Sequence, residues 1–209
     1  MSDFITLTID CLRHGRCEGP EQTLRGRADV ALTAAGRDAM LAAGRRLTPA
    51  GCIITSPLAR CRAVADALAA EWGTPLECLA DIAEMDFGDW DGVPTDTLLE
   101  HDRERLEAFW HDPAQQPPPQ GEHYGAFLAR IERGWQSIIA LAMAHRVEHL
   151  LVCSHAGVIK SWVALRLGMA TSRARHLYKL QLPYAGVVRF QVSINQRSGE
   201  RFEQLCRVC

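Results

Sequence analysis

Arginine and histidine side chains stand at the ends of apolar segments, at positions where a buried strand would stop. Arg13 and His14 follow the first such segment, whereas Arg60 and His155 follow two later ones. An arginine guanidinium matches phosphate oxygens in a bidentate way and keeps its charge at any working pH. One imidazole can attack phosphorus, and a second, as an imidazolium, can stabilise the charge on the transferring group. This set of residue types favours a phosphate pocket that contains a nucleophile.

A leaving alkoxide needs a proton, which a carboxylic acid with a raised pKa can donate. The segment 83–92 holds four carboxylates among aromatic residues and glycines. We expect Glu84 to be the donor, because it lies nearest the end of a short predicted strand, and Asp86 is the second choice. Asp89 and Asp91 are interpreted as exposed loop residues, since charged side chains mostly face solvent.

The elements that must position these residues alternate between strands and helices along the chain, which predicts an α/β fold. Thr33 is a suitable N-cap for one helix, and the pair Ser56-Pro57 predicts the start of the next. The predicted strands cover 4–12, 52–55, 76–79, 149–154, 187–193 and 202–208, and further helices cover 95–110, 124–145 and 158–167.

We expect a three-layer sandwich in which helices flank a mostly parallel central sheet, with the last two strands added antiparallel at an edge. Ligands of such open sheets bind beyond the carboxyl ends of the strands. Parallel strands would bring three segments to that edge, namely Arg13-His14-Gly15, Ser56 to Arg60, and Ser154 to Gly157. The phosphate pocket is therefore predicted at this edge.

The overall composition is that of a soluble globular protein with 23 basic and 25 acidic residues interleaved along 209 positions. This distribution argues against a nucleic-acid surface or a polybasic membrane patch. No apolar stretch reaches membrane-spanning length, and the first ten residues lack the basic region of a secretory signal. We expect a cytoplasmic protein with a single domain over residues 1–209, because no repeat or composition break divides the chain.

Other chemistries have weaker support in the sequence. The eight cysteines mostly occur singly inside apolar segments, which favours buried, reduced thiols. The pair Cys206 and Cys209 lacks the partner residues of a zinc site. Ser154 lies in a segment similar to a serine-hydrolase elbow, but Val152 replaces the leading glycine. Neither of the glycine-rich nucleotide-binding patterns is present.

Five blocks of the chain, in order, resemble the histidine phosphatase superfamily, in the branch that includes cofactor-dependent phosphoglycerate mutases. The resemblance covers roughly residues 5–165 and implies a phosphoglycerate mutase-like fold. The blocks are Leu12-Arg13-His14-Gly15, Asp29 to Gly36 (similar to D-x-P-L-T-x-x-G), Ser56 to Arg60 (S-x-L-x-R), Glu84 to Gly92 (E-x-x-F-G-x-W-E-G) and Ser154 to Gly157 (S-H-G-G).

The resemblance also implies a role for each matching residue. His14 would be the phosphorylated nucleophile and Glu84 the proton donor, while Arg13, Arg60 and His155 would complete the phosphate pocket. The family uses no metal, and no cofactor is expected here. The expected partner is a small phosphorylated substrate, without nucleic acid or membrane.

The chain departs from the family pattern directly after the first block. The family usually continues R-H-G-E-T with an asparagine soon after, whereas this chain has Arg16 and Cys17. We expect Arg16, Thr23 or Arg25 to supply the missing phosphate contacts, although Arg16 is equally well interpreted as an exposed loop residue. Cys17 would be redox-sensitive only if the pKa of its thiol were low.

The implied activity is a metal-independent phosphomonoesterase that works through a phosphohistidine. Within the superfamily, the chain most resembles bacterial α-ribazole-5′-phosphate phosphatases of cobalamin nucleotide-loop assembly. The segments that carry this likeness are Leu24-Arg25-Gly26, Phe87 to Trp90, Phe109 to Pro113 and Gly121-Glu122.

Two alternatives remain, a phosphoglycerate mutase-type phosphoryl transferase and a non-catalytic phospho-ligand binder on the same fold. The segment 93–123 contains a proline-rich break and is expected to cap the substrate. Its modest length favours hydrolysis over the mutase reaction. The apolar strands at the C-terminus permit a homodimer without requiring one.

Overall fold

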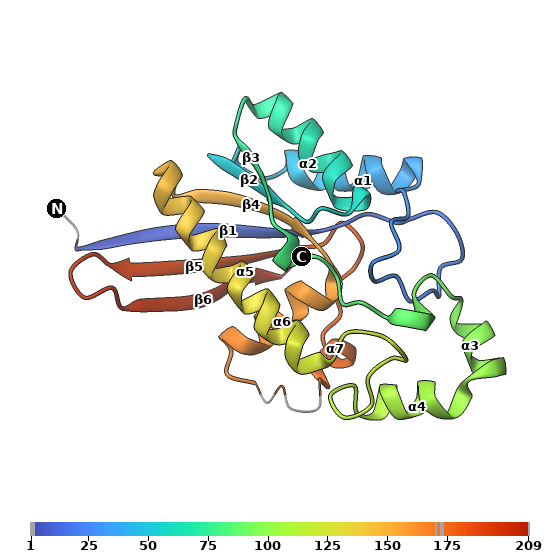
Figure 1. Cartoon of the computed structure of the whole chain (residues 1–209). Coiled ribbons are helices and arrows are strands. Elements are labelled where there is room, and N and C mark those ends of the chain that lie inside the picture. The colour runs from blue at the N-terminus through green and yellow to red at the C-terminus, as the bar shows by residue number, and fades with distance from the viewer. Residues whose placement is uncertain (1–2, 170, 172–173, 209) are drawn as a thin grey trace.

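A six-stranded sheet in the order β3-β2-β4-β1-β5-β6 runs through the molecule (Figure 1). The structure, a computed structural model, describes residues 3–169, 171 and 174–208. β1 to β4 pair in parallel, whereas β5 and β6 are antiparallel and lie at one edge. The strands are β1 Phe4–Arg13, β2 Cys52–Thr55, β3 Leu76–Cys78, β4 His149–Ser154, β5 Val187–Asn195 and β6 Arg201–Val208.

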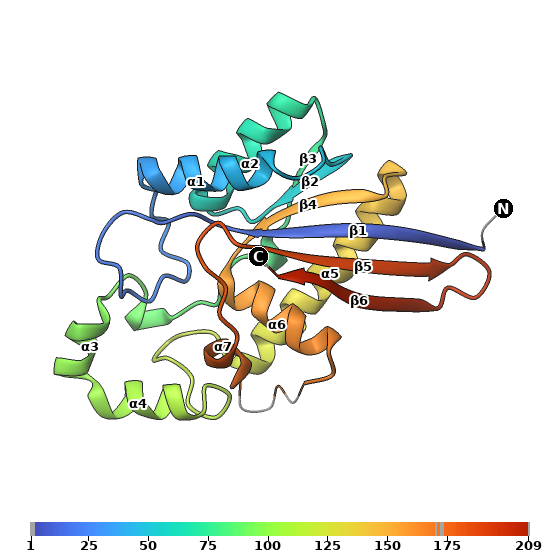
Figure 2. The same ribbon diagram turned by 180° about the vertical axis from the view of Figure 1, so that it is seen from behind.

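Helices cover both faces of the sheet, so the predicted three-layer α/β sandwich is confirmed. α1 (Ala34–Arg45) and α2 (Ala59–Trp72) lie on one face, and α5 (Tyr124–His145) and α6 (Ala156–Arg166) lie on the other (Figures 1 and 2). α3 (Thr95–His101), α4 (Arg103–His111) and α7 (His176–Lys179) gather beyond one end of the sheet, and two 3₁₀ turns occupy Ala80–Ile82 and Gly88–Trp90. None of the described helices is both long and apolar enough to span a bilayer.

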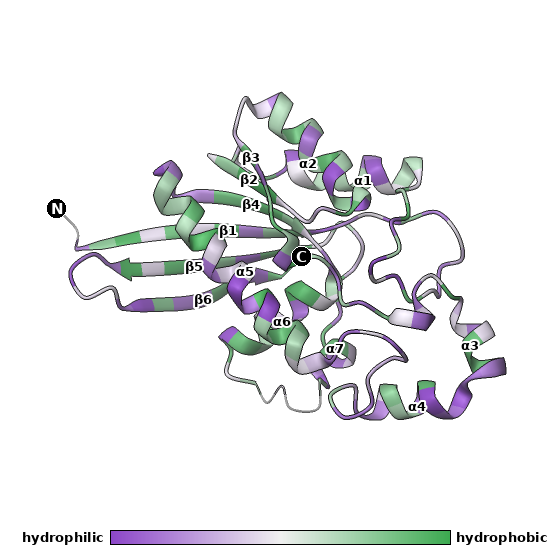
Figure 3. Ribbon diagram, viewed as in Figure 1, coloured by the Kyte–Doolittle hydropathy of each residue, from purple (hydrophilic) through white to green (hydrophobic). Residues whose placement is uncertain are grey.

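Two apolar cores hold the layers together. Alternate residues of β1 point to opposite faces, so Ile9 packs into the core under α5 and α6, whereas Leu12 packs under α1 and α2. Trp135 and Trp162 are fully buried in the larger core, at ring centroids 5.3 Å apart. Figure 3 shows hydrophobic colour along most of β4, the strand buried on both faces. Each fully buried Leu, Ile, Val, Phe or Met side chain in these cores stabilises the fold by about 1.5–3 kcal/mol relative to an exposed one.

Two helix starts show how local signals and distant contacts combine. Thr33 caps α1 as predicted, because its hydroxyl accepts a hydrogen bond from the backbone N–H of Gly36 at 2.9 Å. The predicted start at Ser56-Pro57 is wrong, since α2 begins at Ala59. There the carboxylate of Asp29, far away in the sequence, accepts the N–H of Ala59 at 2.7 Å. Asp29 therefore accepts the hydrogen bond of the N–H group at the start of α2, and the Ser56 hydroxyl is available for another contact.

Candidate active site

The three strand ends that carry the predicted residues do meet. β1, β4 and β2 are adjacent and parallel, so the chain leaves all three at the same edge of the sheet. β1 leads into His14, and β4 leads into His155 at the start of α6. The two imidazole rings lie with their centroids 5.3 Å apart. The predicted convergence of the two histidines is confirmed.

A cavity of about 250 Å³ opens beside His14. Five of the predicted residues line it, namely Arg13, His14, Thr23, Arg25 and Glu84. The other lining residues are largely apolar or aromatic and come from the segments after β1 and β3, from α4, α5, α6 and α7, and from the segment before β5: Leu24, Met85, Phe87, Phe109, Trp110, Phe127, Ala156, Gly157, Lys160, Leu177, Tyr178 and Tyr184.

His14 is held as a neutral imidazole with one nitrogen free. Its Nδ1 lies 2.8 Å from the carbonyl oxygen of Gly15. A carbonyl only accepts hydrogen bonds, so Nδ1 carries the proton and Nε2 keeps its lone pair. Burial, together with the positive charges of Arg60 and Arg13, lowers the pKa of His14 to about 3. At neutral pH the ring can therefore act as a nucleophile through Nε2.

His155 is also neutral, which corrects the expectation of an imidazolium. The side chain is fully buried, and the Nε–H of Arg60 donates to its Nδ1 at 3.3 Å. The proton therefore sits on Nε2, 2.7 Å from the hydroxyl of Ser56. Burial and the charge of Arg60 hold the pKa of His155 well below its usual range. The sequence could not reveal this, because the protonation state depends on how deeply the ring is buried.

Arg60 lies behind the histidines and not among the lining residues of the cavity. Its terminal N–H groups donate to the carbonyl oxygens of Ala28 at 2.8 Å and Gly26 at 2.6 Å. The expectation that Arg60 contacts phosphate directly is thereby corrected. The residue fixes His155 against the loop 25–28, and its charge acts on the site through the electrostatic field.

Asp91 supports the same loop from the other side, which sequence analysis missed. Its carboxylate accepts hydrogen bonds from the backbone N–H groups of Gly26, Arg27 and Ala28. The interpretation of Asp91 as an exposed loop residue is therefore wrong. Asp89 is exposed, as expected.

Glu84 is the acid that reaches the cavity. Its side chain is nearly buried, and its two carboxylate oxygens accept the backbone N–H groups of Met85 at 3.0 Å and Gly157 at 2.9 Å. Asp86, the second choice, does not line the cavity and instead accepts the N–H of Gly88 at 2.8 Å. Glu84 thus stands between β3 and the first turn of α6, facing the site.

Tyr184 and Lys160 line the cavity but were not predicted. The ring of Tyr184 lies 4.0 Å from the Arg13 guanidinium and 5.8 Å from the His14 ring centroid. Lys160 donates from Nζ to the carbonyl of Leu177 at 2.8 Å. Helical spacing could have indicated Lys160, because it lies three residues after Gly157 on the same helix face. No local signal marks Tyr184, since it precedes β5 in a segment without a predicted element.

The three candidates for the missing phosphate contacts differ in position. Thr23 donates to the carbonyl of Pro20 at 2.8 Å, and Arg25 donates to the carbonyl of Glu18 at 2.9 Å, so both are fixed at the cavity rim. Arg16 pairs with Glu21, is exposed and does not line the cavity. The expectation that Arg16 is a pocket cation is corrected in favour of the exposed loop residue.

The seven cysteines within the described residues are free thiols, and five of them are buried as expected, while Cys78 and Cys206 are exposed. Cys209 lies outside the described residues, so the expectation that Cys206 and Cys209 bind no metal stays a prediction. Cys17 places its Sγ 3.6 Å from Nδ1 of His14. Burial raises the pKa of the Cys17 thiol, which keeps the thiolate fraction low at neutral pH.

We therefore expect iodoacetamide at pH 7.5 to alkylate Cys17 about ten-fold or more slowly than Cys78 and Cys206, because the thiolate is the reactive form. Mass-spectrometric mapping of the modified peptides over time measures the three rates. Alkylation of Cys17 at the rate of the exposed cysteines would contradict the assignment of a protonated, shielded thiol.

Comparison with known proteins gives a consistent result. The family model described as histidine phosphatase superfamily (branch 1) matches residues 9–204. An adenosylcobalamin/α-ribazole phosphatase of Escherichia coli is 29% identical over 124 residues, which are 59% of this chain and 60% of that protein. The enzyme of the same name from Salmonella typhimurium is 30% identical over 168 residues, covering 79% of this chain and 82% of the relative.

A solved structure, the α-ribazole phosphatase from Shigella flexneri, superimposes with a TM-score of 0.78 at 25% identity, over 97% of this chain and 96% of that one. The match to the Escherichia coli relative spans less than two thirds of that protein, and the match to a bifunctional protein of Mycobacterium tuberculosis spans 48% of its length.

Proposed function

The chain belongs to branch 1 of the histidine phosphatase superfamily, and we propose that it hydrolyses phosphomonoesters without a metal ion, through a phosphohistidine at His14. The observation that carries the proposal is the state of His14, a neutral imidazole that lines the cavity and whose Nδ1 is held by the carbonyl of Gly15, which leaves Nε2 unprotonated. Arg13 lies beside it and supplies a cation for the phosphate oxygens.

The reaction has two steps, and the proton that Glu84 gives up in the first step is regained in the second. Nε2 of His14 attacks phosphorus, the bond to the leaving oxygen breaks, and Glu84 donates a proton to that oxygen. Water then attacks the phosphohistidine, and the Glu84 carboxylate takes the proton that water loses. His155 lies behind His14 with its Nε2–H directed at the Ser56 hydroxyl and does not line the cavity, so it supports the site from behind, while Arg25 and Thr23 add contacts at the rim. The products are an alcohol and phosphate, and His14 returns to its neutral form.

The substrate we propose is a phosphomonoester with an aromatic group, in particular α-ribazole 5′-phosphate. Phe87, Phe109 and Trp110 form an aromatic part of the cavity lining, which suits a flat ring better than a small, charged sugar acid. Two of these residues come from the segment 93–123, which we accordingly propose as the substrate cap. The names of two relatives, which specify adenosylcobalamin/α-ribazole phosphatase, agree with this choice.

A panel of substrates tests the proposal. We expect hydrolysis of p-nitrophenyl phosphate, a higher kcat/KM with α-ribazole 5′-phosphate, and a low kcat/KM with 3-phosphoglycerate. Stimulation by 2,3-bisphosphoglycerate, with transfer of the phosphoryl group to a sugar acid, would favour the mutase instead. Absence of turnover with every phosphomonoester would favour the non-catalytic binder.

Gly157 provides a test of the Glu84 position. A Cβ at residue 157 would lie 2.3 Å from Oε1 of Glu84, so the carboxylate must move in Gly157→Ala. Because a displacement of about 1 Å can cost about 10²-fold in rate, we expect kcat to fall by about ten- to hundred-fold while the fold is retained. Steady-state kinetics and thermal unfolding measure the two effects.

Gly125→Ala is the matched control, since Gly125 is also the second residue of a helix and has only the ring of His123 near its Cβ position, at 3.6 Å. That variant should keep the kcat of the wild type. An unchanged kcat in Gly157→Ala would show that the Glu84 carboxylate is not placed for proton transfer.

A further inference from the structure

The backbone that carries Glu84 lies outside the sheet. β3 ends at Cys78, and the chain then forms the 3₁₀ turn at Ala80–Ile82 before it reaches Glu84. This segment passes beside α5 (Figure 1). The two come close at Gly134, where a Cβ would lie 2.7 Å from Cγ2 of Ile82. A side chain one turn earlier on α5 can therefore reach the backbone that leads to Glu84.

Arg130 is that side chain, and none of the roles assigned above uses it. Its Nη1 donates to the carbonyl oxygens of Asp81 at 2.8 Å and Ala83 at 2.9 Å, and its Nη2 donates to that of Glu84 at 3.3 Å. The carbonyl between the first two accepts the hydroxyl of Ser154 at 2.8 Å. Side-chain donors thus orient four successive carbonyls, and the direction of the Glu84 side chain depends on them.

Glu122 fixes the orientation of the Arg130 guanidinium. Nε and Nη2 of Arg130 donate to the two carboxylate oxygens of Glu122 at 2.9 and 2.8 Å, the bidentate geometry that the planar guanidinium allows. The two side chains are only 11% and 15% exposed. All three nitrogens of the guanidinium therefore have acceptors, and the group has one orientation.

Glu122 also joins the acid segment to the end of the proposed cap, 93–123. Its backbone N–H donates to the carbonyl of Asp86 at 2.9 Å, and its carboxylate accepts the N–H of Asp86 at 3.4 Å. The N–H of Asp89 donates to the carbonyl of Pro119 at 2.9 Å. The segment 84–89 is thus bound to α5 on one side and to the end of the cap on the other.

We propose that Arg130 is a positioning residue for proton transfer, which acts through Glu84. Arg130 is not among the residues that line the cavity. Its hydrogen bonds hold the backbone in the conformation that directs the Glu84 carboxylate at the leaving oxygen. This role rests on the proposed function, in which Glu84 is the proton donor.

Arg130→Lys tests this role, because lysine keeps the charge but cannot bind a carboxylate in a fork and three carbonyls at once. We expect kcat/KM for glycerol 1-phosphate to fall by about ten- to hundred-fold, since a displacement of about 1 Å can cost about 10²-fold in rate. The constant for p-nitrophenyl phosphate should change by less than about three-fold, because p-nitrophenolate leaves without a proton. The ratio of the two constants is independent of the fraction of enzyme that is folded.

Arg133→Lys is the matched control. Arg133 lies three residues later on α5 and its Nη2 is 3.3 Å from the carboxylate of Asp81, but its side chain is 64% exposed. This variant should keep the ratio of the wild type. An unchanged ratio in Arg130→Lys would overturn the proposal, and so would an equal change in both variants.

The double variant of Glu84→Gln and Arg130→Lys shows whether Arg130 acts through Glu84. Its ratio should equal that of Glu84→Gln within about two-fold, because proton donation is lost only once. A ratio changed by the product of the two single effects would overturn the proposal. If Glu84→Gln itself left the ratio unchanged, the donor and its positioning residue would fail together, whereas an effect of Glu84→Gln alone would overturn only the role of Arg130.

Amide hydrogen exchange gives a measurement that needs no turnover. The N–H groups of Met85 and Gly157 donate to the Glu84 carboxylate, so both should exchange at least about ten-fold faster in Arg130→Lys than in Arg133→Lys. Equal exchange rates at these two amides would show that Arg130 does not hold Glu84 and would overturn the proposal, even if the chain hydrolyses no phosphomonoester.

Discussion

Replacing His14 with alanine is expected to lower kcat/KM for p-nitrophenyl phosphate by about 10⁴-fold or more, the scale on which loss of a catalytic nucleophile acts. The loss follows from geometry, because His14 is the histidine among the described lining residues of the cavity and its Nδ1 is held by the carbonyl of Gly15, which leaves Nε2 unprotonated. Arg13, Arg25 and Glu84 would remain in place, so the variant should still bind phosphate. Steady-state kinetics and an inhibition constant for phosphate measure the two quantities separately.

The covalent intermediate gives a second measurement of the same prediction. A phosphohistidine survives alkaline quenching and is lost in acid, so a base-quenched wild-type sample should carry one phosphoryl group on the peptide that contains His14. The His14→Ala variant should carry none. Phosphorylation of another residue in that variant, or activity above about a tenth of the wild type, would assign the nucleophile elsewhere.

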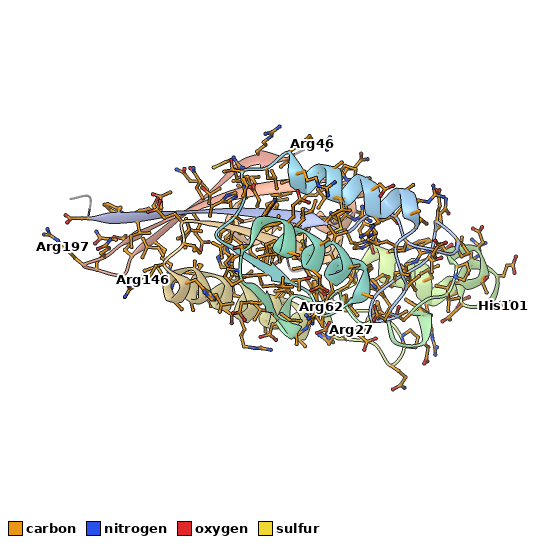
Figure 4. The ribbon with its side chains drawn as sticks, turned by 90° about the horizontal axis from the view of Figure 1, so that it is seen from above. Arg27, Arg46, Arg62, His101, Arg146 and Arg197 are labelled. Atoms are coloured by element: carbon orange, nitrogen blue, oxygen red, sulfur yellow. The ribbon has the colours of Figure 1, made fainter. Side chains whose placement is uncertain are left out.

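His101→Ala is the control for the general effect of removing an imidazole. His101 is exposed at the end of α3 and lies at the opposite end of the molecule from Arg197 in Figure 4. It does not line the cavity beside His14, so kinetics and phosphorylation should match those of the wild type.

The residues that sequence analysis placed well are those fixed by strand direction. Arg13 ends β1, and His14 and His155 follow β1 and β4; a parallel sheet brings such ends together whatever the details of the loops. Glu84 could be chosen over Asp86 because it lies closer to the end of β3. These predictions needed only the order of the elements and the direction of the strands.

The residues that were missed, or that make other contacts than expected, depend on contacts between distant segments. Arg60 turns towards the loop 25–28 because carbonyls of that loop accept its N–H groups, and Asp91 holds the same loop from its other side. Tyr184 reaches Arg13 through a turn with a left-handed residue, Ala185, that no glycine marks in the sequence. Such contacts form only after the layers have assembled, so neither periodicity nor local signals could indicate them.

The neutral state of His155 has the same origin. An isolated histidine beside a phosphate site would be expected to carry a proton, but Arg60 donates to its Nδ1 and the ring is fully buried. A protonated His155 would place a second positive charge beside that of Arg60 at this depth, without a counter-ion for it. The positive charges of the site are therefore those of the arginines. The protonation state of His155 thus depends on its surroundings in the folded protein, whereas its position could be predicted from the sequence.

Glu84→Gln is expected to lower kcat/KM for an alkyl phosphate, such as glycerol 1-phosphate, by about 10²–10⁴-fold, the usual contribution of general acid catalysis. The effect on p-nitrophenyl phosphate should be much smaller, because p-nitrophenolate leaves without a proton. The comparison uses kcat/KM, since this constant covers the steps up to release of the alcohol. The later attack of water, in which Glu84 acts as a base, influences kcat alone.

Glutamine retains the size of the side chain, but its amide can accept only one of the two hydrogen bonds that Met85 and Gly157 donate to Glu84, so thermal unfolding must confirm that the fold persists. Asp86→Asn serves as the matched control, because Asp86 is a neighbouring acid that does not line the cavity. If Glu84→Gln slowed the alkyl and the p-nitrophenyl ester by the same factor, proton donation would have to be assigned to another group. A loss in Asp86→Asn confined to the alkyl ester would identify Asp86 as that group.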